Sequence, residues 1–224
     1  MKKKIEINTN KTYTIEEASK LLPEVSTSKF TGSVDIDIVL NLKEKQKKEI
    51  IRGSVTLPNS MGDTKKVAVV CDEKDEKLAL EAGADMAGVK VVDAILSGEA
   101  SFDVIIATPA MMGQIAKAAK LLGPKGLMPN PKNGTVTTDV SKAVQSFKAG
   151  RLNFKSVPEQ GAIRLKVAKL DMPAEKIQEN LIALLKVVHS ESKKLSSNPF
   201  KRVTVSPTMG AGLKLDVNDI INHV

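Results

Sequence analysis

With 224 residues, 42% of them hydrophobic, the chain can bury a core as one large domain or as two modest ones. The single cysteine excludes a disulfide framework, and with only two histidines it also excludes a Cys/His metal site. No run of about 18 apolar residues is present, which excludes a membrane span. These features predict a reducing, cytoplasmic setting. A formal charge of +8 favours a polyanionic partner, while an aromatic content of only 3% argues against base stacking on an aromatic platform.

The first 57 residues predict a helix followed by a strand. Thr14 and Glu17 have the spacing of a capping box, and apolar residues then mark one helical face as far as Leu22. From Val34 to Leu42 apolar residues alternate with other residues, as expected of a strand with one buried face. Residues 43–49 carry many charges and predict a hairpin tip, either solvated or touching phosphate, that leads to a partner strand ending near residues 55–57.

The middle of the chain changes pattern after a turn-rich stretch, residues 57–65, where we expect a hinge. Two continuous apolar runs, residues 67–71 and 103–108, predict strands buried on both faces. Helical patterns follow them, the last closed by a glycine at position 150. Strands that alternate with helices in this way indicate a parallel α/β layer.

The stretch GPKGLMPNPKNG, residues 123–134, resembles a phosphate-binding loop only superficially. A Walker loop needs G-x-x-x-x-G-K-[ST], but here Gly123 and Gly126 are three apart and Lys132 precedes an asparagine. Three prolines also remove backbone donors that an anion would need. We therefore interpret the stretch as a stiff surface loop.

The pattern of the first segment returns after Phe154. A strand through residues 163–167, a long helix through residues 177–188 and a hairpin around the turn at residues 207–212 complete the chain. We expect an α+β domain, an antiparallel sheet with packed helices, built from residues 1–65 and 159–224. An α/β three-layer, Rossmann-like domain of residues 66–158 interrupts it.

Catalytic machinery is not recognisable in the sequence, so we expect a protein that is not an enzyme and uses no cofactor or metal. The pair Gly210 and Gly212 lacks the third glycine of a dinucleotide fingerprint, and Cys71 lies in an apolar run typical of a buried thiol. Two alternatives stay open on these grounds: an α/β enzyme that binds a phosphorylated small ligand, and a protein-interaction module.

Three stretches carry a resemblance: TSKF at 27–30, ATPAMMGQIAKAAKLLGPKGLMPNPKNGTV at 107–136 and SPTMG at 206–210. With the interrupted layout, they closely resemble the bacterial large-subunit ribosomal protein L1 family from about Tyr13 to Leu215. The resemblance implies a cytoplasmic, ribosome-associated protein that binds the mobile stalk of large-subunit rRNA. It also implies help in releasing deacylated tRNA from the exit site, repression of translation through the leader of its own mRNA, and a monomer off the ribosome.

The resemblance also implies which residues touch RNA. Lys29 can neutralise a phosphate, Thr208 can donate to or accept from a 2′-hydroxyl, and Gly210 can let RNA approach the backbone. Phe30 and Met209 offer apolar area, unless they are buried in the core. The implied primary contacts are Glu17, Lys29, Phe30, Arg164, Thr208, Met209 and Gly210, and the weaker secondary ones are Lys125 and Lys132.

Some positions leave their role open or depart from the family pattern. Glu17 near RNA is unfavourable by charge, so it either accepts from a 2′-hydroxyl or base amine, orients a lysine, or only completes the capping box. Arg164 stands where a histidine is usual, Asn59 replaces another common histidine, and Glu159 replaces a lysine. The change at Glu159 puts an RNA contact at that turn in doubt, whereas Arg164 can keep one.

Overall fold

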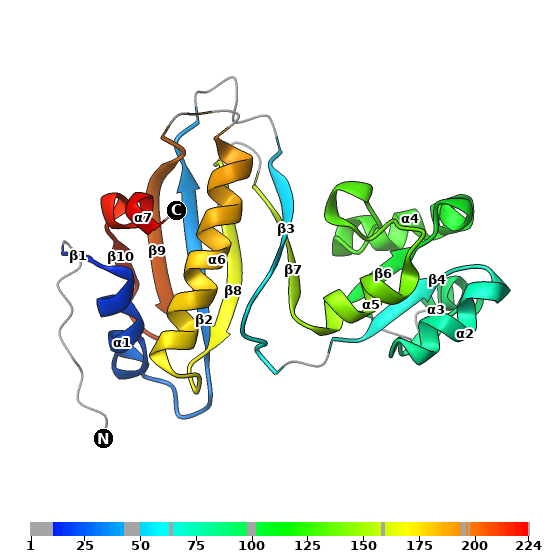
Figure 1. Ribbon diagram of the computed structural model, residues 1–224, viewed down its shortest axis with the longest axis horizontal. Helices are drawn as coiled ribbons and strands as arrows, with labels where there is room; N and C mark the ends of the chain where they lie inside the picture. The colour runs from blue at the N-terminus through cyan, green and yellow to red at the C-terminus, as the bar shows by residue number, and fades with distance from the viewer. Residues whose placement is uncertain are drawn as a thin grey trace. The chain divides into compact units, whose positions relative to one another are not determined.

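The computed structural model describes residues 11–42, 50–62, 65–97, 102–157, 160–193, 196 and 198–223. Its backbone contacts divide the chain into two compact units, Met1–Met61 with Asn153–Val224, and Gly62–Leu152 (Figure 1). We call them the terminal unit and the inserted unit and describe each by itself. Each combines α-helices with a β-sheet, as the sequence predicts.

The terminal unit is built on a five-stranded sheet of order β1-β10-β9-β2-β8. Strand β2 is antiparallel to both neighbours, and the edge strand β1 is parallel to β10. The predicted alternation is confirmed, because every second residue of β2 from Val34 to Leu40 is buried. The strands are β1 (Thr12–Tyr13), β2 (Ser33–Leu40), β8 (Ala162–Lys169), β9 (Phe200–Pro207) and β10 (Leu213–Leu215).

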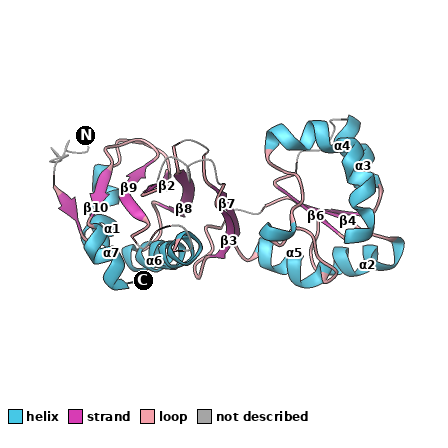
Figure 2. Cartoon of the chain, turned by 90° about the horizontal axis from the view of Figure 1, so that it is seen from above, coloured by secondary structure: helices cyan, strands magenta, loops and turns pink. Residues whose placement is uncertain are grey.

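Three helices pack on the buried face of this sheet (Figure 2). They are α1 (Ile15–Val25), α6 (Ala174–Ser192) and α7 (Val217–His223). The apolar stripe predicted for α6 is confirmed, since its members are fully buried. Pro173 lies one residue before the helix, where its fixed φ and missing N–H do no harm.

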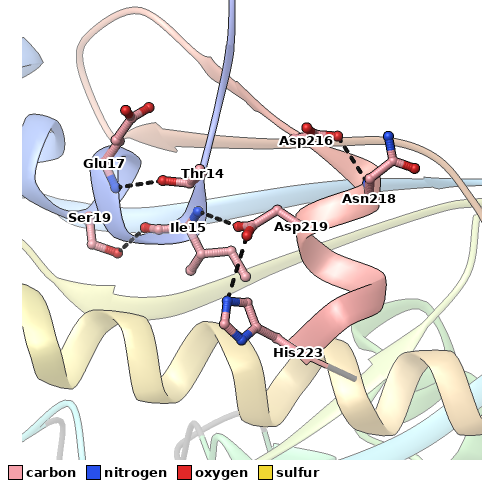
Figure 3. Close-up of polar contacts among 8 residues, drawn as sticks. All are labelled: Thr14, Ile15, Glu17, Ser19, Asp216, Asn218, Asp219 and His223. Atoms are coloured by element: carbon pink, nitrogen blue, oxygen red, sulfur yellow. Dashed lines mark hydrogen bonds and ion pairs between the residues drawn. The ribbon is translucent and has the colours of Figure 1, made fainter.

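The start of α1 is capped by two side chains from opposite ends of the chain (Figure 3). Thr14 Oγ1 accepts a hydrogen bond from Glu17 N at 3.2 Å, and Asp219 Oδ2 accepts one from Ile15 N at 3.0 Å. Only half of the predicted capping box forms, because the Glu17 carboxylate bonds to no residue that the structure describes. His223 Nε2 lies 3.6 Å from the other oxygen of Asp219.

The predicted hairpin around residues 207–212 is confirmed, because β10 pairs with β9 in antiparallel register, but a helix follows it where the sequence predicts that the hairpin ends the chain. Val217 begins α7 rather than extending β10, because Asp216 Oδ1 accepts a hydrogen bond from Asn218 N at 2.9 Å and starts a helix. The alternation of Leu213, Leu215 and Val217 fits a strand equally well, so the pattern alone misplaces the boundary.

Strand β3 (Arg52–Thr56) pairs with β7 (Arg151–Lys155) and not with β2, so the predicted hairpin between β2 and β3 is wrong. The pairing depends on Gly53, where an added Cβ would lie 2.6 Å from the ring of Phe154. The predicted hairpin tip, residues 43–49, lies outside the described residues.

The inserted unit contains a parallel three-stranded sheet of order β5-β4-β6 with helices on both faces. One core joins the sheet to α2 (Glu73–Glu81) and α5 (Val140–Lys148), and the other joins it to α3 (Lys90–Ser97) and α4 (Met112–Lys125). The predicted parallel α/β layer is confirmed, although the sequence analysis did not predict β5 or α3. The strands are β4 (Val67–Val70), β5 (Met86–Ala87) and β6 (Val104–Ala107).

The proline-rich stretch after α4 is folded by its own polar groups. Gly126, at a φ of 70°, ends α4, and Gly134, at 67°, closes the loop. Thr135, the next residue, accepts at its Oγ1 from Asn130 N at 2.7 Å and donates to Asn130 O at 3.1 Å. Residues 123–125, expected in the loop, instead form the last turn of α4, because Pro124 removes only one hydrogen bond there. The 3₁₀ helix η2 (Pro109–Met111) precedes α4, and η3 (Pro131–Asn133) lies within the loop.

Candidate RNA interface

The turn after β9 is held against the segment between α1 and β2. Met209 O accepts from both the backbone N and the Oγ1 of Thr27, at 2.9 and 3.2 Å. Thr208 N donates to Ser33 O at 2.9 Å, and Thr208 Oγ1 accepts from Ser33 N at 2.7 Å. Segments about 180 residues apart in the sequence are thereby fixed to one another. We call Lys29, Phe30, Thr208, Met209 and Gly210, which lie on these segments, the turn cluster.

Gly210 is required by the protein itself. A Cβ at this position would lie 2.7 Å from Val25 O and 2.6 Å from Pro207 Cγ, so no side chain fits. The sequence analysis explained the absence of a side chain at Gly210 by the close approach of RNA to the backbone. The structure instead shows that the glycine lets the turn approach the end of α1.

The Thr208 hydroxyl has one interaction left to offer. Its proton is donated to Ser33 O at 3.2 Å, and one of its lone pairs accepts from Ser33 N. A hydroxyl has one donor and two acceptor positions, so a single lone pair remains. Thr208, which is exposed, can therefore accept from a 2′-hydroxyl but cannot donate to one without breaking its own bond.

Phe30 and Met209 are not core residues, so that alternative is wrong: their exposed fractions are 58% and 53%. The Phe30 backbone is held in place, because its carbonyl accepts from Ser28 Oγ at 2.9 Å, and Ser28 Oγ lies 2.9 Å from Ser26 Oγ. Both serines are buried. Lys29 is exposed and forms no ion pair with the residues that the structure describes. The cluster therefore presents apolar surface and a free cation on a fixed backbone.

Two of the predicted contacts lie away from the turn cluster. Glu17 is exposed on the first turn of α1, roughly 12 Å along the helix axis from Val25. Arg164 lies opposite Asp37 across the β2–β8 pair, roughly 13 Å along β2 from Ser33, and its Nε is 3.2 Å from Asp37 Oδ1. Arg164 is therefore neutralised in part, although its side chain stays largely exposed.

The sheet face opposite the helices carries alternating polar groups of both signs. Burial raises the pKa of Asp35, and the neighbouring Lys166 opposes this shift. Lys214 of β10 lies opposite Thr204 on the same face. Lys214 was not predicted as a contact, although its position between Leu213 and Leu215 places it away from the core.

Sequence reasoning also missed Thr27 and Ser33, which hold the turn. No local signal could have found them, because their partners lie far away in the sequence. The side chains of Lys125 and Lys132, and all of Glu159, lie outside what the structure describes. Asn59 is bonded inside the terminal unit, where Asn180 Oδ1 accepts from its backbone N at 3.0 Å.

Other kinds of site find no support in the described part of the chain. It contains no group of three His, Cys, Asp or Glu side chains able to hold a metal ion. None of its helices is long and apolar enough to cross a membrane. Cys71 is fully buried, and burial raises the pKa of its thiol, as expected of an inert structural cysteine.

Comparison with known proteins agrees with the resemblance seen in the sequence. Residues 22–211 match the model of the ribosomal protein L1p/L10e family. The chain is 42% identical over 219 residues to the large ribosomal subunit protein uL1 of Macrococcus caseolyticus, covering 96% of this chain and 94% of that protein. It is 41% identical over 212 residues to uL1 of Lactobacillus johnsonii, covering 94% and 92%. It is 39% identical over 216 residues to uL1 of Francisella tularensis subsp. novicida, covering 96% and 93%.

Proposed function

Because the chain belongs to the ribosomal protein L1p/L10e family, we propose that it binds the mobile stalk of large-subunit rRNA through the turn cluster. Membership makes it a structural protein of the large ribosomal subunit and leaves the enzyme alternative without support. The terminal unit is the RNA-binding domain in this proposal, and the inserted unit is a separate domain.

The observation that carries the proposal is the arrangement of the turn cluster. Phe30 and Met209 expose apolar surface on a backbone fixed by hydrogen bonds, and Lys29 and Thr208 add a cation and one lone pair. Folded RNA presents sugars, phosphates and 2′-hydroxyls to such a surface. Apolar contact with a sugar or base, phosphate neutralisation by Lys29 and acceptance of a 2′-hydroxyl proton by Thr208 then complement each other. Recognition rests on shape and backbone.

The direct test is filter binding to a stalk rRNA fragment across a salt series. We expect log K to fall linearly with log salt, because lysines and arginines displace counterions from phosphates. Met209→Ala should weaken binding without changing thermal unfolding, since the side chain is exposed. Affinity for a scrambled RNA equal to that for the stalk fragment would contradict the proposal. So would a Met209→Ala variant that binds as the parent does.

The remaining predicted contacts enter the proposal as additions. Glu17 can accept from a base amine or 2′-hydroxyl, because no described residue bonds to its carboxylate. Arg164 has guanidinium donors beyond the one it directs at Asp37. We also assign a weaker contact to the loop that carries Lys125 and Lys132. Single Glu17→Gln and Arg164→Gln variants, measured in the same binding assay, separate these contributions from that of the turn cluster.

Two regulatory roles complete the proposal: release of deacylated tRNA from the exit site, and repression through the protein's own mRNA leader. A surface that recognises the shape of folded RNA can bind both the stalk of the rRNA and a stalk-like element in the mRNA leader. A competition experiment tests the repressor role: leader RNA should displace stalk rRNA, because both bind the same surface. Tightly bound leader RNA that does not compete would contradict it. Cytoplasmic ribosome association and a monomeric free protein belong to this proposal as well.

A further inference from the structure

The inserted unit has almost no net charge, yet its charges are separated along the chain. Residues 72–103 contain nine acidic and three basic residues, whereas residues 104–152 contain seven basic and one acidic. The two halves therefore carry formal charges of −6 and +6. Plain solvation of a surface needs no such separation, and mixed signs are the usual arrangement.

The fold turns this separation in sequence into a separation in space. The acidic half supplies α2, β5 and α3, with β5 at one edge of the three-stranded sheet. The basic half supplies β6 at the other edge, together with α4 and α5. Because α2 shares one face with α5, and α3 shares the other with α4, the two helices beside β6 are both basic, whereas beside β5 α2 is acidic and α3, with Lys90 and Asp93, has no net charge. Figure 2 shows this order of helices around β4 and β6.

The cations on the basic edge differ in what they contact. On α5, Lys148 lies 3.4 Å from Asp85 and Lys142 lies 3.4 Å from Asp139. On α4, Lys117 and Lys120 are exposed and form no ion pair with any residue in the described part of the chain. They are three residues apart and therefore lie on one side of the helix. The buried face of α4 is formed by Ile115, Ala118 and Leu122.

We propose that the outer side of α4 is a second RNA contact, in which Lys117 and Lys120 neutralise phosphates without reading sequence. The inference rests on the proposed function, because the RNA is the stalk rRNA that the turn cluster binds. The charge of α4 complements the phosphate backbone, while the acidic edge of the same unit repels it. The separated charges therefore select which edge of the inserted unit faces the RNA.

The test uses a matched pair of double variants in the full chain. Lys117→Gln with Lys120→Gln removes two cations from the basic edge. Lys74→Gln with Lys77→Gln removes two cations with the same spacing from exposed positions on α2, at the acidic edge. Both double variants lower the net charge by the same amount, so a difference between their salt slopes shows the effect of where the lysines lie. Each is titrated with the stalk rRNA fragment at several salt concentrations, and thermal unfolding confirms that both fold.

We expect the salt slope of log K to become shallower by about 1 to 2 for the α4 variant, since each lost phosphate contact contributes about 0.7 to 0.9. The α2 variant should keep the parent slope. Equal slopes for both variants would overturn the inference, whether both shift or neither does, and the proposed function would stand. A parent that fails to prefer stalk rRNA over scrambled RNA would overturn both.

Discussion

The two units of this chain divide its charge unequally. The terminal unit contains 22 basic and 15 acidic residues, a net of +7, whereas the inserted unit contains 12 and 11, a net of +1. Both expose apolar side chains, for example Phe30 in the first and Leu78 in the second. Phe30 lies on the segment that Thr27 and Ser33 bond to the turn at Met209 and Thr208, whereas Leu78 lies on α2, in the half of the inserted unit with a formal charge of −6. Exposed apolar area alone therefore does not identify the RNA surface.

The largest expected effect comes from removing the inserted unit at two different boundaries. Deleting residues 62–152 behind a short linker should leave a folded RNA-binding chain. Deleting residues 66–158 removes Phe154, which packs on Gly53, and Ser156, which bonds to Ile51, so it should lower the free energy of unfolding by about 3 to 5 kcal/mol. Urea unfolding and stalk RNA binding of both deletions check this. Equal stability would show that β7 contributes nothing to the terminal unit.

The second prediction compares exposed apolar residues in the two units. Phe30→Ala should weaken stalk RNA binding by about 1 to 3 kcal/mol, the range for an aromatic side chain stacked on nucleic acid. Leu78→Ala, at a similarly exposed position, should leave binding unchanged. Neither should shift the free energy of unfolding by more than about 0.5 kcal/mol. An equal loss of affinity in the two variants would remove the distinction between the units.

The third prediction compares two glycines. Gly210→Ala should destabilise the protein by about 1 to 3 kcal/mol, because its Cβ would meet Val25 O and Pro207. Gly113→Ala in α4 should instead stabilise it by about 0.5 kcal/mol, because a Cβ there has nothing within 4 Å and glycine is unfavourable in a helix. Thermal unfolding measures both. A Gly210→Ala variant of parent stability would show that the turn does not depend on this close approach.

The smallest effects concern two aspartates with opposite pKa shifts. A hydrogen bond from Val67 N, aided by Lys148, lowers the pKa of Asp85, so Asp85 contributes stability above a pH of about 4 and loses it as the pH falls through the lower folded value. Burial raises the pKa of Asp35, so its ionisation opposes folding at neutral pH, and this effect disappears on acidification.

Asp85→Asn should therefore destabilise the protein at pH 7 and Asp35→Asn should stabilise it, each by less than about 1 kcal/mol because both sites are partly exposed. The two differences should shrink together as the pH approaches 3. Unfolding measured at pH 7 and pH 3 gives the sign of the stability change for each variant. Shifts of the same sign at pH 7 would contradict the assigned causes.

Much of the fold followed from local patterns. The apolar stripe of α6 and the alternation in β2 each face one core, and the continuous apolar runs of β4 and β6 are covered on both faces, so the apolar pattern alone reveals all four elements. The errors arose where a distant residue decides the outcome. The pairing of β3 with β7 depends on Phe154 fitting Gly53, and the first residue of α7 depends on the Asp216 cap.

The candidate site was predictable only as separate stretches. The sequence offers TSKF and SPTMG as independent segments, and only the bonds from Thr27 and Ser33 to the turn bring them together. The remaining role of the Thr208 hydroxyl and the reason for Gly210 depend on neighbours more than 170 residues away. Such contacts leave no periodic trace. The separated charges of the inserted unit were readable in the sequence, but their meaning required the strand order.

Crosslinking inside cells tests most directly whether the terminal unit provides the main RNA contact. A photoreactive benzoylphenylalanine is placed at Phe30 in one version of the chain and at Leu78 in another, and the RNA joined to each is sequenced after irradiation. We expect stalk rRNA of the large subunit to be attached at position 30 and little RNA at position 78. RNA recovered mainly at position 78, or none at position 30, would contradict the account.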